Sequence, residues 1–314
     1  MSILTVRNLT KKYSDSCIAV NNVSFSVERG ETLGILGPNG AGKTTTIHML
    51  LDLLTPTSGS ITYFGKDFYT HRSEILQKVG FGTTYSRLPG SMSVYNNLDI
   101  FGRLYGLSYA QRTKKIDELL ELLGVSHLKN REAGELSAGE TTRVILAKAF
   151  LADPEIVLLD EPTASLDVDI AQSVREFICH QSEQGVSFLF TSHNMHEMTQ
   201  VCDRIIVMQD GVIVADNTPE QLSENVSRSF LQLMVGDHLP ACIAYAQQQN
   251  IPHTVLEHMI TFEIDEHAVA QTLIDLAHHG ITYTQISIKK PTLEDYFLSI
   301  TSKNSKKGKN YESQ

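Results

Sequence analysis

The sequence is poor in cysteine, in long apolar runs and in positive charge. Its four cysteines lie far apart in 314 residues and form no C-x-x-C pair, which argues against disulfides or a zinc site. No apolar run approaches the ~20 residues of a membrane-spanning helix, and the first residues have no secretory layout. With 26 Lys and Arg against 36 Asp and Glu, the formal charge is -10, which disfavours nucleic-acid binding. We expect a cytoplasmic protein that reaches a membrane only through a partner.

One stretch carries a specific chemical signal, because it fits the phosphate-loop pattern G-x-x-x-x-G-K-[ST]. It consists of Gly37, Pro38, Asn39, Gly40, Ala41, Gly42, Lys43 and Thr44, and Thr45 follows it. An apolar segment at 32–36 runs into the loop and a helix-like segment at 44–51 runs out of it. Average composition would produce the four fixed positions in roughly one chain of this length per hundred. This strand–loop–helix context predicts a nucleotide site.

The residue types explain how such a loop binds ATP. Its glycines let successive backbone amides point at phosphate oxygens, and the helix N-terminus adds a positive dipole end. Lys43 is expected at the β- and γ-phosphates, and Thr44 offers its hydroxyl to Mg²⁺. The apolar run 155–159 is typical of a buried parallel strand and ends in Asp160, which is placed to hold Mg²⁺. Glu161 comes next and can polarise a water molecule for in-line attack.

The first two thirds of the chain alternate between strand-like and helix-like segments. Strands outside the phosphate-loop region are expected at 3–9, 20–28, 204–209 and 212–215. Helical patterns near 94–105 and 109–123 indicate a helical insert over about 84–150. We predict an α/β fold for residues 1–225, a P-loop NTPase core with an antiparallel β subdomain and this insert.

Beyond residue 226 the order of elements changes to β-α-β-β-α-β, and its last strand is expected at 281–288. This order fits a small ferredoxin-like α+β domain over 226–301 with a trailing helix. The final residues, 302–314, are polar and rich in lysine. We expect them to form a disordered tail.

The complete set of motifs resembles the ATP-binding cassette (ABC) family over about residues 3–216. Its signature is matched by Leu136, Ser137, Ala138, Gly139 and Glu140, its D-loop by the segment that ends in Asp167, and its switch histidine by His193. Tyr13, expected in a loop between the first two strands, is either packed on its neighbours or a platform for a purine ring. The family stacks adenine at this position.

The resemblance implies how the site works. Two cassettes close head to tail with ATP at both seams, so the partner is a second copy or a close paralogue. Ser137 and the Gly139 amide, at a helix N-terminus, then bind the γ-phosphate of the opposite subunit. His193 hydrogen-bonds the γ-phosphate and is catalytic together with Glu161.

Two positions depart from the family pattern. Thr84 stands where the family has a glutamine, and its shorter side chain puts direct reach to Mg²⁺ in question. In the signature, which is usually Leu-Ser-Gly-Gly-Gln, Ala138 replaces the first glycine and Glu140 replaces the glutamine. Alanine is a small change, and the Glu140 carboxylate can still bond locally. We expect hydrolysis that is retained but slow, with altered coupling to a membrane partner.

The segment 291–298 is similar to the C-terminal part of ATPase subunits from bacterial exporters. The alternative interpretation of this segment is an ordinary amphipathic helix without a family-specific role. The resemblance implies an ATP-hydrolysing subunit, peripheral on the inner face of the cell membrane, that powers separate integral permease subunits. Two alternatives are a soluble cassette ATPase acting on ribosomes or DNA and a catalytically dead regulatory cassette. The single cassette, the acidic charge and the complete set of Lys43, Asp160, Glu161 and His193 favour the exporter subunit.

Overall fold

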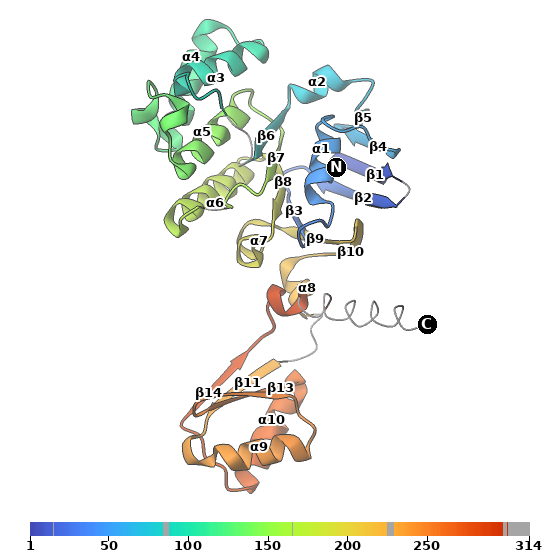
Figure 1. The fold of residues 1–314 in the computed structure, drawn as a ribbon, viewed down its shortest axis with the longest axis vertical. Helices are drawn as coiled ribbons and strands as arrows, with labels where there is room; N and C mark the ends of the chain where they lie inside the picture. The colour runs from blue at the N-terminus through green and yellow to red at the C-terminus, as the bar shows by residue number, and fades with distance from the viewer. Residues whose placement is uncertain (15, 84–87, 165, 225–228, 298–299, 301–314) are drawn as a thin grey trace. The chain divides into compact units, whose positions relative to one another are not determined.

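The chain divides into two compact units, Met1–Pro219 and Glu220–Gln314 (Figure 1). The computed structural model describes residues 1–14, 16–83, 88–164, 166–224, 229–297 and 300, apart from the side chain of residue 266. Across these described residues, no helix combines the length and the apolar character that crossing a bilayer requires. The two units have separate hydrophobic cores.

The first sheet of the N-terminal unit is antiparallel and has the strand order β2-β1-β4-β5. Its strands are β1 (Ser2–Ser14), β2 (Cys17–Glu28), β4 (Ser58–Tyr63) and β5 (Lys66–Asp67). The strands predicted at 3–9 and 20–28 are therefore confirmed, and both extend further than expected. The placement of Tyr13 in a loop is wrong, because β1 keeps pairing with β2 as far as Ser14. The polar residues Lys11, Lys12 and Ser14 gave no sign in the sequence that β1 continues to pair with β2.

The second sheet has six strands in the order β10-β9-β3-β8-β7-β6. They are β3 (Thr32–Leu36), β6 (Val79–Thr83), β7 (Ile156–Asp160), β8 (Ser187–Ser192), β9 (Arg204–Gln209) and β10 (Val212–Asn217). All neighbours pair in parallel except the hairpin β9–β10. Every residue of β3, β7 and β8 is buried, as expected for strands covered on both faces. Because they are parallel, these strands end at the same edge of the sheet, where ligands bind in such folds.

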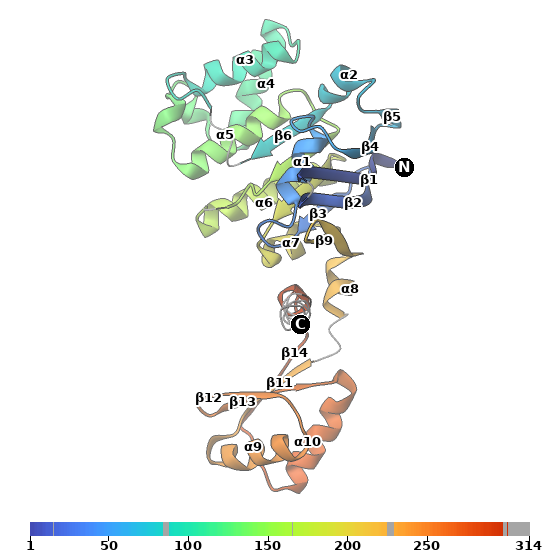
Figure 2. The same ribbon diagram turned by 45° about the vertical axis from the view of Figure 1, so that its right-hand side comes forward.

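Helices lie on and beside this sheet, and Figure 2 shows α3 and α4 next to each other, away from β1 and β2. The helices of this unit are α1 (Lys43–Leu50), α2 (Arg72–Leu76), α3 (Val94–Leu104), α4 (Tyr109–Leu122), η1 (Ser126–Leu128), η2 (Ala133–Glu135), α5 (Ala138–Phe150), α6 (Val168–Glu183) and α7 (Met195–Val201). Helix α8 (Pro219–Glu224) begins at the last residue of this unit and otherwise belongs to the second unit. The two helices predicted near 94–105 and 109–123 are thus confirmed. In α4, a capping box of Ser108 and Gln111 begins the helix.

One hydrophobic core joins the two sheets of the N-terminal unit. Leu4 and Val6 of β1 belong to the same buried cluster as Ile35 of β3, Ile47 of α1 and Leu158 of β7. Alternation in β1 sends its apolar side chains inward. The antiparallel sheet therefore packs on the parallel sheet and on the helix that follows the phosphate loop, and this packing fixes the base of the loop.

The C-terminal unit has one antiparallel sheet in the order β12-β13-β11-β14. Its elements are β11 (Ser229–Met234), η3 (Gly236–His238), α9 (Leu239–Gln248), β12 (His253–Leu256), β13 (Met259–Ile264), η4 (Glu266–Ala268), α10 (Val269–His278) and β14 (Gln285–Lys289). Alternate residues of the central strands, among them Leu231 and Phe262, are buried in one cluster with Tyr245 of α9 and Leu276 of α10. The last strand begins only at Gln285, so the start expected at 281 is wrong.

Shortening a side chain of the central strand β8 tests how much this core stabilises the unit. Leu189 is fully buried, so Leu189→Ala is expected to lower the free energy of unfolding by about 2–5 kcal/mol. The matched control is Leu104→Ala, because Leu104 is 74% exposed and its loss should change the free energy by less than about 0.5 kcal/mol. Urea unfolding of the chain measures both values. Equal effects would contradict the assignment of β8 to the core.

Candidate functional site

The phosphate loop connects β3 to α1 and depends on two left-handed glycines. Gly40 has φ 83° and Gly42 has φ 102°, a region that L side chains rarely adopt. The surroundings of the two glycines differ. A Cβ on Gly42 would lie 2.5 Å from the carbonyl oxygen of Ala19 in β2, whereas a Cβ on Gly40 would meet nothing within 4 Å. Strand β2 therefore packs directly against the backbone that starts the helix.

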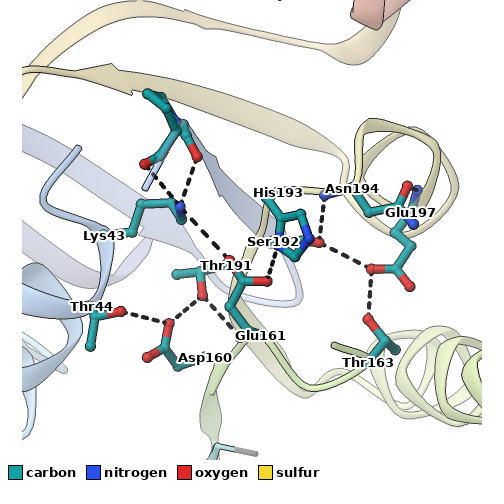
Figure 3. A network of polar contacts seen from close by, with 12 residues as sticks. Lys43, Thr44, Asp160, Glu161, Thr163, Thr191, Ser192, His193, Asn194 and Glu197 are labelled. Atoms are coloured by element: carbon teal, nitrogen blue, oxygen red, sulfur yellow. Dashed lines mark hydrogen bonds and ion pairs between the residues drawn. The ribbon is translucent and has the colours of Figure 1, made fainter. Parts of the chain in front are cut away.

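Lys43 is the first residue of α1, and its side chain turns back over the loop (Figure 3). Its ammonium group donates to the carbonyl oxygens of Gly37 and Pro38, at 2.7 and 3.3 Å. It also lies 3.8 Å from a carboxylate oxygen of Glu161. The side chain is only 6% exposed, so this cation needs its oxygen partners. The lysine thus holds the loop together and points into the site.

Asp160 ends β7 and is held by hydroxyl groups from two other elements. The Thr191 hydroxyl donates to Asp160 Oδ1 at 2.5 Å, and the Thr44 hydroxyl lies 3.4 Å from the same oxygen. Asp160 and Thr191 are register partners in the parallel pair β7–β8, and Asp160 is 1% exposed. One carboxylate oxygen is therefore fixed by neighbours, and the sheet edge places it beside the first turn of α1.

Glu161 follows directly and has a left-handed backbone, with φ 52°. Its amide donates to the carbonyl and to the hydroxyl of Thr191, both at 3.1 Å, which compensates for this sparsely populated conformation. Glu161 Oε2 lies 2.6 Å from His193 Nδ1. The Glu161 side chain is 9% exposed and that of His193 is 63% exposed. The structure thus brings Lys43, Asp160, Glu161 and His193 together, as the sequence predicts.

The signature residues lie at the start of α5 and begin that helix. Ser137 is the N-cap, its hydroxyl accepts from the Glu140 amide at 3.3 Å, and the Ser137 amide donates to the Glu140 carboxylate at 2.7 Å. That backbone hydrogen bond lowers the pKa of Glu140. Ser137 and Ala138 are exposed, whereas Gly139 is buried against Ile170 of α6. Glu140 therefore bonds locally, in a capping box.

The remaining predicted residues stand apart from the cluster. Tyr13 is 59% exposed, and Lys11 Nζ lies 5.5 Å from its ring centroid. Asp167 is the N-cap residue of α6 and makes no side-chain cap hydrogen bond. Thr84 lies outside the described residues. Over the described ranges, no hydrogen bond or ion pair joins Ser137, Asp167 or Tyr13 to Lys43 or Glu161.

Sequence reasoning missed four polar residues that support the site, namely Thr163, Thr191, Ser192 and Glu197. Thr191 bonds Asp160, and Glu197 accepts hydrogen bonds from Thr163 and Ser192. The contacts of Thr191 with Asp160 and of Thr163 with Glu197 join segments more than 30 residues apart, so the residues alone gave no signal for them. Ser192 and Glu197 are only five residues apart. The parallel register of β7 and β8 was the missing information.

The comparisons with known proteins agree with this geometry. A family model for the ABC transporter matches residues 20–164. The linearmycin resistance ATP-binding protein LnrL of Bacillus subtilis (strain 168) is 30% identical over 306 residues, 95% of this chain and 98% of that protein. The chain belongs to the ABC transporter ATP-binding family. As a member, this ABC protein binds nucleotide and is an ATPase.

Further relatives of this ABC protein have related names. The Nod factor export ATP-binding protein I of Burkholderia orbicola (strain AU 1054) is 33% identical over 298 residues, 94% of this chain and 95% of that protein. A solved structure of MJ1267, an ATP-binding cassette of an ABC transporter in its ADP conformation, has 28% identity and a TM-score of 0.63, covering 72% of this chain and 94% of that one. The cassette fold, with mixed α/β content and several sheets, is thereby established.

The two left-handed glycines give a matched test of the phosphate loop. Gly40→Ala should lower the free energy of unfolding by about 1–2 kcal/mol, the cost of a left-handed alanine. Gly42→Ala carries the same cost and also forces the loop away from the Ala19 carbonyl, which adds about 1–3 kcal/mol. Denaturant unfolding without nucleotide measures the difference. Equal losses would mean that β2 does not limit the space at Gly42.

Proposed function

We propose that the chain is the ATP-hydrolysing subunit of an ABC exporter and that it powers separate membrane subunits. The observation that carries this proposal is the full-length similarity to export proteins. The bacitracin transport ATP-binding protein BcrA of Bacillus licheniformis is 30% identical over 302 residues, 95% of this chain and 97% of that protein. The similarity to BcrA, LnrL and the Nod factor protein extends through both units of the chain. It supports transport rather than action on a ribosome.

The chain's own residues explain how ATP would bind. We propose that backbone N–H groups of the loop 37–45, in which Pro38 has none to donate, hold the phosphates and that Lys43 exchanges its carbonyl partners for phosphate oxygens. The hydroxyl of Thr44 and the carboxylate of Asp160 are oxygen donors beside each other, which suits the ligand preference of Mg²⁺. When bound, Mg²⁺ neutralises charge on the β- and γ-phosphates. Tyr13 would stack on the adenine with its exposed ring.

Hydrolysis needs a base and a group that senses the γ-phosphate. Glu161 is buried beside Lys43 and contacts His193, so it is placed to take a proton from an attacking water molecule. His193 would hydrogen-bond the γ-phosphate with its exposed ring. Thr84, at the position where the family has glutamine, would leave hydrolysis retained but slow and would alter coupling to the membrane subunits.

A second copy, or a close paralogue, would complete the site. Ser137 and Ala138 are exposed at the N-terminus of the 13-residue helix α5, where amides favour anions. We propose that Leu136 to Glu140 contact the γ-phosphate of the opposite subunit and that Asp167 lies at the same interface. ATP would then stabilise the dimer, and hydrolysis would release it. The chain would work at the inner face of the cell membrane, bound to integral permease subunits.

The C-terminal unit fits a ferredoxin-like domain over 226–301, because its sheet order places the first and third strands at the centre. The cassette would then cover 1–225, with its helical part at about 84–150 and a polar tail at 302–314. We propose that this domain adds surface to the dimer. Deletion of 226–314 should weaken ATP-dependent dimerisation in sedimentation experiments, and an unchanged dimer would contradict this role.

Replacement of the proposed base tests the ATPase mechanism. Glu161→Gln should lower kcat for ATP hydrolysis about 100- to 10000-fold and leave nucleotide binding intact, because the amide keeps the shape of the carboxylate. The matched control is Glu183→Gln, at an exposed position on α6, which should keep the activity of the unaltered chain. Phosphate release measures the rates. The mechanism fails if the unaltered chain hydrolyses no more ATP than Glu161→Gln does.

The exporter role predicts a membrane partner. Tagged Glu161→Gln, trapped with ATP in cells, should co-purify from detergent-solubilised membranes with a stoichiometric multi-spanning protein identified by mass spectrometry. The partner should be lost in a Lys43→Ala control that does not bind ATP. Recovery of ribosomal proteins, or of the homodimer alone from the soluble fraction, would contradict the exporter role.

A further inference from the structure

Glu197 on α7 is a buried carboxylate that the proposed mechanism does not use. Its side chain is 4% exposed. A carboxylate removed from water in this way destabilises the fold unless it is paired and hydrogen-bonded. Its position, four residues after the switch histidine, belongs to none of the motifs described above. The arrangement of its partners indicates what it does.

One oxygen of Glu197 joins the loop after β7, which carries Glu161, to the end of β8, which His193 follows (Figure 3). The Thr163 hydroxyl donates to Glu197 Oε2 at 2.6 Å, and the Ser192 hydroxyl donates to the same oxygen at 3.1 Å. Thr163 comes two residues after Glu161, and Ser192 directly precedes His193. A single acceptor atom therefore sets the spacing between Thr163 and Ser192. Both residues lie within two positions of Glu161 or His193, which contact each other.

The other carboxylate oxygen of Glu197 contacts Arg175, and this contact holds the carboxylate in place. Arg175 Nη1 of α6 lies 3.3 Å from Glu197 Oε1, and the Arg175 side chain is 15% exposed. At the backbone, the Asn194 side chain caps α7 by accepting from the amides of His196 and Glu197, at 3.1 and 3.3 Å. The carboxylate is thus held from α6 and from its own helix. It has little freedom to follow a displacement of either segment.

We propose that Glu197 is a positioning residue for ATP hydrolysis. It holds Thr163, in the loop after β7, and Ser192, at the end of β8, at the distance at which His193 Nδ1 meets Glu161 Oε2, 2.6 Å. This inference rests on the proposed ATPase mechanism. None of the hydrogen bonds of Glu197 reaches Lys43 or Thr44. Loss of the link therefore changes kcat and leaves the affinity for ATP unchanged.

The test removes one hydroxyl without changing the shape of the site. Thr163→Val deletes the donor to Glu197, and Thr163→Ser keeps it. We expect Thr163→Val to lower kcat about 10- to 100-fold, as misplacement of reacting groups does, with the Kd for ATP unchanged. Thr163→Ser should restore most of the activity. Ser192→Ala provides a second deletion of a donor to the same oxygen, should Thr163→Val fail to fold as judged by its thermal unfolding midpoint.

A double-mutant cycle separates positioning from general damage. If Glu197 acts through the pair Glu161–His193, Thr163→Val should cost little further activity in a His193→Ala background, because the spacing no longer matters there. Losses that multiply, or equal kcat values for Thr163→Val and Thr163→Ser, would overturn the inference and leave the ATPase mechanism standing. If the unaltered chain is no more active than Glu161→Gln, the mechanism and the inference fall together.

Discussion

Parallel pairing of β3, β8 and β7 is the constraint on which the rest of the site depends. Parallel strands end at one edge of the sheet. The phosphate loop after β3, the carboxylates at the end of β7 and the histidine after β8 therefore lie close together, although they are far apart in the sequence. Register adds the finer control, since it sets Thr191 opposite Asp160. A slip of one residue would turn these side chains to the other face of the sheet.

Most of the site's charges are buried, and each of them has partners. Lys43 bonds loop carbonyls, Asp160 accepts a hydroxyl, and Glu197 faces an arginine and two hydroxyls. Removing such groups from water is costly, and only this pairing offsets the cost. The same low-dielectric surroundings strengthen the interactions that the site makes. A network in which few groups are free to reorient suits the proposed reaction, which would depend on the placement of Glu161 and His193.

The two functional surfaces of the chain are separate. The phosphate loop and its carboxylates form one cluster, whereas Ser137 and Ala138 present an exposed helix start at the beginning of α5. The signature serine keeps its capping role within one copy, because Glu140 completes the capping box where the family has glutamine. The N-terminus of a helix favours an anion, here one on another molecule. In the proposed dimer of two copies, both surfaces would be used at once.

The amino-acid sequence alone predicts the phosphate loop, the strand that ends in Asp160 before Glu161, the main helices and the family. These features are local, since each follows from glycine positions, apolar runs or spacing within one segment. Three features emerge only from the folded chain: β1 continues through Tyr13, Thr191 holds Asp160, and Glu197 links the loop after β7 to the end of β8. The reason is physical: strand register and the partners of buried polar groups are set by packing between distant segments, and no local pattern of residues records them.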